Sequence, residues 1–138
     1  MMSPSRVLLS IALTVLVSSC ATSRSEQELN YTASALTKVS AAVDATVQYM
    51  SVPHGASSAE ILELSTSDDP ALLAPFKGFQ ILARREGSFS EVLVCERDGS
   101  RALLEDAGCT AKLDRTHWRD NPHARCEFTL DLKSICAQ

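Results

Sequence analysis

Apolar residues recur at helical spacing between positions 25 and 50, while polar residues occupy the other faces. The apolar stripe consists of Leu29, Ala33, Leu36, Val43, Val47 and Met50, with Val39 beside it. Ser25 and Glu28 have the spacing of a capping box, which predicts a helix start. We expect a long amphipathic helix over 25–50 that packs on the domain's own sheet, with another protein or a second copy of the chain as the alternative partner.

Two short helical turns are predicted in the segment that follows. Pro53, His54 and Gly55 end the first helix. Ser57 and Glu60 repeat the capping-box spacing and favour a short helix over 59–64, although its aliphatic content also fits a strand. Asp69 before Pro70 predicts a further turn over 71–74, which Pro75 should stop.

The pattern changes to short β-type runs after Phe76. Segments 79–85 and 89–97 read as two strands joined by a turn at Glu86 and Gly87. The second is so apolar that we expect it at the centre of the sheet. Asp98 and Gly99 form the strongest hairpin signal, which would place Cys95 opposite Ala102 and Val94 opposite Leu103 in a third strand over 100–104.

The C-terminal part predicts one or two more strands. Residues 105–108 should turn the chain, 109–113 are short and β-like, and 115–125 form a polar loop. Segment 126–133 alternates strictly between apolar and polar residues, as a half-buried strand does. The predicted fold class is α+β: a long N-terminal amphipathic helix on a four- to five-stranded antiparallel sheet.

The N-terminal segment has the form of an export signal. Arg6 precedes a weakly polar to apolar run over 7–17, followed by Ser18, Ser19 and Cys20. Eleven helical residues span about 16 Å, whereas a bilayer's hydrocarbon core is about 30 Å thick, so a retained membrane span is too short. An ordinary signal peptide cut near Ala21 is the more serious alternative.

The ending Val17, Ser18, Ser19, Cys20 resembles the lipobox of bacterial lipoproteins. The resemblance implies a signal peptide over 1–19, acylation of Cys20 and a tether over 20–24 before a single domain over 25–138. In that class Ala21, which is not aspartate, implies sorting to the outer membrane. We therefore expect a lipid-anchored protein that faces the periplasm.

Composition narrows the function classes. Removal of residues 1–19 leaves 119 of the 138 residues, with 12 lysines and arginines against 17 aspartates and glutamates, because Arg6 is the only charge removed. That length suits one domain. A mildly acidic chain without a basic patch excludes nucleic-acid binding.

The cysteine count supports lipidation. Five cysteines occur, Cys20, Cys95, Cys109, Cys126 and Cys136, and an odd count in an exported protein leaves one thiol over. Acylation of Cys20 leaves four that can form two disulfides in an oxidising compartment. Three connectivities are possible, and if the strands at Cys109 and Cys126 are antiparallel neighbours, Cys109–Cys136 with Cys95–Cys126 is favoured.

The polar loop holds the candidate partner-binding residues. Trp118, the only tryptophan, lies among Arg115, Arg119 and Arg125. Tryptophan and arginine dominate binding interfaces, and a loop held by disulfides loses less entropy on binding. The alternative is that Trp118 covers an edge of the sheet with solvated arginines around it.

Metal binding and catalysis are not expected. Cys109, His117, His123 and Cys126 could supply two sulfurs and two nitrogens, but zinc would need both thiolates reduced in an oxidising compartment. The sequence has no serine elbow, helical His-Glu zinc motif or glycine-rich phosphate loop. The adjacent acids Asp68–Asp69 and Glu105–Asp106 are interpreted as solvated turn residues.

The sequence therefore predicts a non-enzymatic envelope lipoprotein without metal or cofactor. Its expected partners are membrane lipid, through the acyl chains on Cys20, and an unidentified envelope protein, which it would contact as an accessory or adaptor. The alternative is a small inhibitor or exclusion factor that binds an exported enzyme or receptor through the Trp118 loop.

Overall fold

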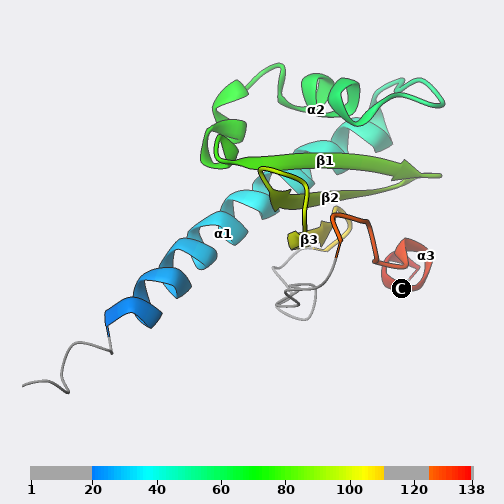
Figure 1. The fold of residues 1–138 in the computed structure, drawn as a ribbon. Helices are drawn as coiled ribbons and strands as arrows, with labels where there is room; N and C mark the ends of the chain where they lie inside the picture. The colour runs from blue at the N-terminus through cyan, green and yellow to red at the C-terminus, as the bar shows by residue number, and fades with distance from the viewer. Residues whose placement is uncertain (1–19, 111–124, 138) are drawn as a thin grey trace, which may run out of the picture. The chain divides into compact units, whose positions relative to one another are not determined.

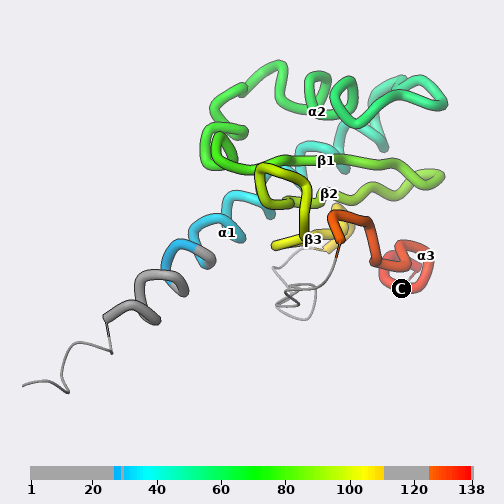
Figure 2. Tube along the Cα trace, viewed as in Figure 1, coloured from blue at the N-terminus to red at the C-terminus, as the bar shows by residue number. Residues whose placement is uncertain are grey.

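The computed structural model describes residues 20–110 and 125–137 (Figure 2). Its elements are α1 (Cys20–Tyr49), α2 (Ser58–Thr66), the 3-10 helix η1 (Pro70–Phe76), β1 (Phe79–Glu86), β2 (Phe89–Glu96), β3 (Ala102–Ala107) and α3 (Leu132–Cys136) (Figure 1). The chain divides into two units, Met1–Tyr31 and Thr32–Gln138. The sheet, the core and both disulfides belong to the second unit.

The predicted amphipathic stripe is buried where it belongs to the second unit. Ala33, Leu36, Val39, Val43 and Val47 form one core cluster with the strand residues Val92, Val94 and Leu104. The residues of α1 in this unit therefore pack on the domain's own sheet. α1 begins at Cys20 rather than at Ser25, and Met50, predicted on the stripe, lies just beyond the helix with 52% of its surface exposed.

The short segment between α1 and the sheet is helical. Ser57 caps α2: its Oγ accepts from Glu60 N at 3.3 Å, while Glu60 Oε2 accepts from Ser57 N at 2.7 Å. This reciprocal pair selects the predicted helix over a strand. Asp69 caps η1 through Ala71 N at 3.2 Å, as predicted, but Pro75 does not stop this 3-10 helix, which continues to Phe76.

β1, β2 and β3 form an antiparallel sheet with β2 in the centre, as predicted (Figure 1). Gly87 and Gly99 occupy positive φ values of 64° and 70° in the two connecting turns. Cys95 pairs with Ala102 as expected, but a register shift places Val94 opposite Leu104 rather than Leu103. The connecting turn is wider than the predicted two-residue turn. Its closing bond runs from Glu96 N to Arg101 O at 3.0 Å, and Gly99 N bonds to Glu96 O at 2.8 Å inside it.

The strand predicted for the C-terminal segment is absent from the structure. Segment 126–130 contains no strand, and Leu132 begins α3 instead of ending a strand. The residues that the structure describes form three strands rather than four or five. Of the short strand predicted over 109–113, Cys109 lies in a turn and 111–113 fall outside the described residues.

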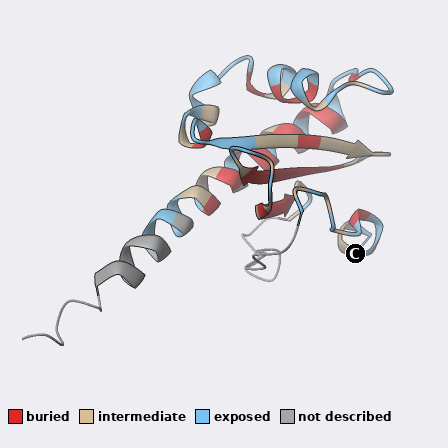
Figure 3. Cartoon of the chain, in the orientation of Figure 1, coloured by how far each residue is buried: buried red, intermediate tan, exposed pale blue. Residues whose placement is uncertain are grey.

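β2 is buried on both faces of the sheet, from Ser90 to Cys95, whereas β1 is mostly half-buried (Figure 3). One face packs on α1 and α2. The other carries a smaller apolar cluster, in which Leu93, Cys95 and Ala102 contact the C-terminal residues Cys126 and Phe128. We call this second surface the C-terminal face. No helix within residues 20–110 and 125–137 is long and apolar enough to span a bilayer.

Candidate partner-binding site

The segment that contains the predicted binding loop is flanked by two disulfide-bonded cysteines, Cys109 and Cys126. Cys95 bonds to Cys126, and Cys109 bonds to Cys136. This is the favoured pairing, but it does not arise from neighbouring strands, because Cys126 lies in an irregular segment and Cys109 in a turn. Cys109 precedes residues 111–124 and Cys126 follows them, so each flank of that segment is covalently tied to another part of the chain.

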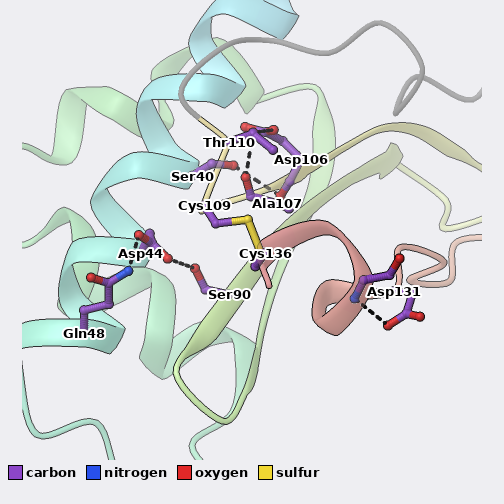
Figure 4. Close-up of a disulfide and its surroundings, with 11 residues drawn as sticks. Ser40, Asp44, Gln48, Ser90, Asp106, Ala107, Cys109, Thr110, Asp131 and Cys136 are labelled. Atoms are coloured by element: carbon purple, nitrogen blue, oxygen red, sulfur yellow. Dashed lines mark hydrogen bonds between the residues drawn. A yellow bond between two sulfur atoms is a disulfide. The ribbon is translucent and has the colours of Figure 1, made fainter. Parts of the chain in front are cut away.

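The first flank is fixed to the end of β3. Thr110 Oγ1 donates to Asp106 Oδ1 at 2.9 Å, and Thr110 N bonds to Ala107 O at 3.0 Å (Figure 4). Asp106 is buried, with 1% of its surface exposed. These bonds close a tight turn immediately before the undescribed segment.

The same end of the sheet lies close to α1. Ser90 Oγ donates to Asp44 Oδ1 at 3.3 Å, and Gln48 Nε2 donates to Asp44 Oδ2 at 2.7 Å (Figure 4). Gly108 sits between these groups: a Cβ on it would lie 2.5 Å from Ser90 Oγ and 2.6 Å from Asp44 Cβ. The absence of a side chain at Gly108 therefore permits this close approach of helix and sheet.

Gly108→Ala is expected to destabilise the domain by about 1–3 kcal/mol, because an added methyl group must push apart a packed helix and strand. Gly78→Ala is the matched control, since its Cβ would meet nothing within 4 Å. Urea unfolding of both variants measures the difference. Equal stability of the two would show that α1 yields to the added group.

The second flank is fixed to the C-terminal face by a buried carboxylate. Glu105 Oε1 accepts from Thr129 N at 2.5 Å and from Leu130 N at 3.2 Å, while its Oε2 accepts from Thr129 Oγ1 at 2.6 Å. Arg84 adds two contacts: its Nη2 donates to Leu130 O at 3.1 Å and its guanidinium lies 4.9 Å from the Phe128 ring centroid. We use the name carboxylate clamp for Arg84, Glu91 and Glu105 together with residues 128–130, which Arg84 and Glu105 contact.

Glu91 completes the clamp, and its burial favours the protonated form of its carboxyl group. Its Oε2 accepts from Arg84 Nε at 2.6 Å, while its buried Oε1 receives no hydrogen bond from a donor in the described residues. Burial, then the shared hydrogen bond with Glu105, raises the pKa of Glu91 to about 8, although Arg84 opposes the shift. When protonated Glu91 donates a hydrogen bond to Glu105, the clamp contains one cation, Arg84, and one anion, Glu105. Its net charge is then zero.

Glu105 is the ionised partner. Burial works against its ionisation, but hydrogen bonds from Glu91 and Thr129 and from the backbone of Leu130 outweigh it and lower its pKa. Environment thus separates two carboxyl groups of the same type into a donor and an acceptor.

The raised pKa of Glu91 predicts a loss of stability as pH rises toward and through about 8. Between about 4.5, the ordinary value, and about 8 the folded chain binds more protons than the unfolded chain at this group, so the free energy of unfolding falls with rising pH. Urea unfolding from pH 5 to pH 9 should show this decline. Glu91→Gln, which keeps a neutral donor, should flatten it, whereas an unchanged slope would place the proton elsewhere.

Some of the site residues predicted from the sequence lie outside the described part of the structure, and others have a role different from the predicted one. Trp118, Arg115 and Arg119 lie in 111–124, outside the described residues, as do His117 and His123. The disulfides consume Cys109 and Cys126, which removes both sulfur ligands from the alternative metal reading. Glu105 and Asp106 are not solvated turn acids, because both belong to β3 and are 1% exposed.

The sequence pattern does not predict the clamp as a whole, but it contains one signal for it. Glu91 sits directly before the apolar run 92–95, in a strand predicted to be buried. A charge in such a strand requires a polar partner on the same face. The sequence does not identify Glu105 as that partner, because its pattern predicts a turn over residues 105–108.

Comparison of the chain with protein-family models, with curated proteins and with solved structures found no match.

Proposed function

We propose that this chain is an envelope lipoprotein, anchored in the outer membrane through acylated Cys20, which acts by protein contact as an accessory or adaptor without catalysing a reaction. The observation that carries the proposal is the disulfide pairing. Two bonds use Cys95, Cys126, Cys109 and Cys136, and the fifth cysteine of the sequence is the one that ends the lipobox-like segment.

The disulfides also support an exported location. Such bonds persist in oxidising compartments, including the bacterial periplasm, and are rare in the cytosol. Signal-like residues 1–19 provide a route of export, and Cys20 provides the site at which an anchor would be attached. The two lines of support are independent, since one comes from the N-terminal segment and the other from the folded domain.

Replacement of Cys20 by serine tests the anchor. In a bacterial host with an outer membrane, the unaltered chain should incorporate labelled fatty acid and fractionate with the outer membrane. Cys20→Ser should lose the label completely and leave the outer-membrane fraction. Mass spectrometry of the mature amino terminus identifies the modification directly.

Ser23→Ala, three residues beyond Cys20, is the matched control and should retain the label. An unmodified amino terminus near Ala21 in the unaltered protein would contradict the proposal and establish an ordinary cleaved signal peptide. Free thiols at Cys95, Cys109, Cys126 and Cys136 in the exported protein would equally contradict it.

A second candidate function is inhibition or exclusion of an exported enzyme or receptor through the Trp118 loop. Its support is the anchoring of both flanks: a disulfide and a hydrogen-bonded turn precede residues 111–124, while a disulfide and the carboxylate clamp follow them. Fixed ends reduce the conformational entropy that a loop loses on binding.

Trp118→Ala decides between a binding and a packing role for this side chain. A binding role predicts lost recovery of crosslinked partner from intact cells with unchanged thermal stability. Lys77→Ala, which removes an exposed cation outside the loop, is the control and should keep partner recovery. Unchanged recovery with lowered thermal stability would end the binding hypothesis.

A further inference from the structure

A pocket of about 350 Å³ lies beside β1, on the opposite side of the strand from β2. Residues 52–56, the first turn of α2 and the end of the β1–β2 hairpin line it. That volume is at the small end of ligand pockets, which run from roughly 300 to 1,000 Å³. It suits the tip of a chain or a small molecule rather than a folded surface.

Arg85 is held in place at this pocket by two carbonyls. Its Nε donates to Gly87 O at 2.7 Å and its Nη1 donates to Val52 O at 2.9 Å. A guanidinium has five N–H groups, and these two bonds use two of them. Among the described contacts, the other three N–H groups are left to bind a ligand. Because both carbonyls are backbone groups, Arg85 is positioned while its positive charge has no carboxylate partner among residues 20–110 and 125–137.

The other lining residues favour an anion with an apolar neighbour. None of the described residues that line the pocket is acidic, and Arg85 and His54 are among them, while the charge of Arg84, a further lining residue, is paired with Glu91. Ser58 Oγ accepts from Ala83 N at 2.7 Å, which leaves its hydroxyl hydrogen available to donate. Val52, Pro53 and Ile61 supply an apolar wall.

The strand edge adds backbone groups to the pocket. Ala83 N points away from β2, toward Ser58, and Ser90, the register partner of Arg85, directs its carbonyl to Gly108 in the opposite direction. Since successive residues of a strand alternate, Arg85 turns its own N–H and C=O to the same edge as Ala83, beside the Ser58 hydroxyl that bonds to Ala83 N. Among the described residues only Ala83 N of these edge groups has a partner.

We propose that this pocket binds the C-terminal carboxylate of an extended peptide whose last residues run along the edge of β1. The carboxylate takes the Arg85 guanidinium and the Ser58 hydroxyl, while the backbone before it pairs with the strand edge. The last side chain lies against Val52 and Ile61. The inference rests on the proposed function, because it names the partner chemistry of a protein that acts by contact.

The test uses the full chain in a mild detergent and random heptapeptides displayed with a free C-terminus. Enriched peptides are synthesised as matched acid and amide forms, and their Kd values are measured by calorimetry. Amidation should weaken binding by about tenfold or more, because it removes a charge-assisted hydrogen bond. Arg85→Lys should weaken the acid form about tenfold and leave the amide form unchanged, since lysine lacks the planar fork.

Arg97→Lys, at an exposed position in the second hairpin turn, is the matched control and should leave both Kd values unchanged. Equal affinity of acid and amide peptides, no enriched peptide, or inorganic phosphate binding as tightly as the peptide would each overturn the proposal. The acid and amide comparison decides even if an Arg85 variant fails to fold. The fatty-acid label on Cys20 is measured in a separate experiment. A chain that is acylated but selects no peptide would therefore overturn the peptide-binding inference and leave the proposed lipoprotein function intact.

Discussion

Replacing Cys95 and Cys126 together by alanine is expected to lower the free energy of unfolding by about 4–5 kcal/mol. The bond closes a separation of 31 residues, for which the chain-entropy relation gives about 3.7 kcal/mol. Cys95 is also fully buried beside Leu93 and Ala102, so loss of its sulfur adds roughly 1 kcal/mol of lost apolar burial. This loss is a large fraction of the free energy of unfolding, which is typically about 5–15 kcal/mol for a folded domain.

The second disulfide supplies the matched comparison. Cys109–Cys136 closes 27 residues, and the same relation gives about 3.6 kcal/mol, almost the same as for the first bond. Cys109 is exposed, so its replacement adds little burial cost. Urea unfolding under oxidising conditions should therefore rank the Cys95/Cys126 variant below the Cys109/Cys136 variant. The reverse order would show that unfolded-state effects, rather than burial, set the difference.

Glu105→Ala is expected to destabilise the domain by about 3 kcal/mol, because hydrogen bonds to a charged group contribute roughly 1.5–3 kcal/mol each and two strong ones are lost at Thr129. The loss should be partly offset, since Glu91 then ionises against Arg84. The backbone N–H groups of Thr129 and Leu130 should exchange with solvent faster than in the unaltered chain. Urea unfolding and hydrogen exchange measure the two effects.

Glu63→Ala is the control for this variant, because Glu63 is exposed on α2 and should change stability by less than about 0.5 kcal/mol. Glu105→Ala also makes a prediction about pH. With Glu105 absent, Glu91 loses the partner that shares its proton, so the decline in stability toward pH 8 should shrink. A Glu105→Ala variant as stable as Glu63→Ala would mean that the clamp does not hold the C-terminal segment.

The helix and the hairpins could be predicted because their causes are local. Leu36, Val39 and Val43 repeat at helical spacing, and such a stripe must be buried wherever the helix packs. Gly87 and Gly99 mark turns that need positive φ, which few other residues adopt without strain. The centre of the sheet followed from the unbroken apolar run in β2.

The last predicted strand failed for a reason that no local pattern contains. Cys126, Phe128 and Leu130 do alternate with polar residues, and Phe128 does contact the sheet. However, Thr129 N and Leu130 N both bond to the Glu105 carboxylate, whereas consecutive N–H groups of a strand point to opposite sides. A side chain from β3 takes the donors that a neighbouring strand would have used.

The candidate sites divide in the same way. Cys20 is predicted as a lipidation site by its neighbours in the sequence, and the even number of remaining cysteines predicts two disulfides without any structure. Arg85 has no distinguishing sequence context, and only the fold brings it between Val52 O and Gly87 O at the side of a pocket.

The sequence by itself determined the helix stripe, the glycine turns, the central strand and the cysteine parity, because each depends on residues close together in the chain. The tertiary structure alone decided which acids are buried, where the C-terminal segment lies and which arginine faces a pocket. Those outcomes depend on side chains that meet across the sheet, 14 residues apart for Glu91 and Glu105 and 24 for Glu105 and Thr129. Burial then fixes the charge of each group, since a carboxyl removed from water ionises only where enough donors surround it.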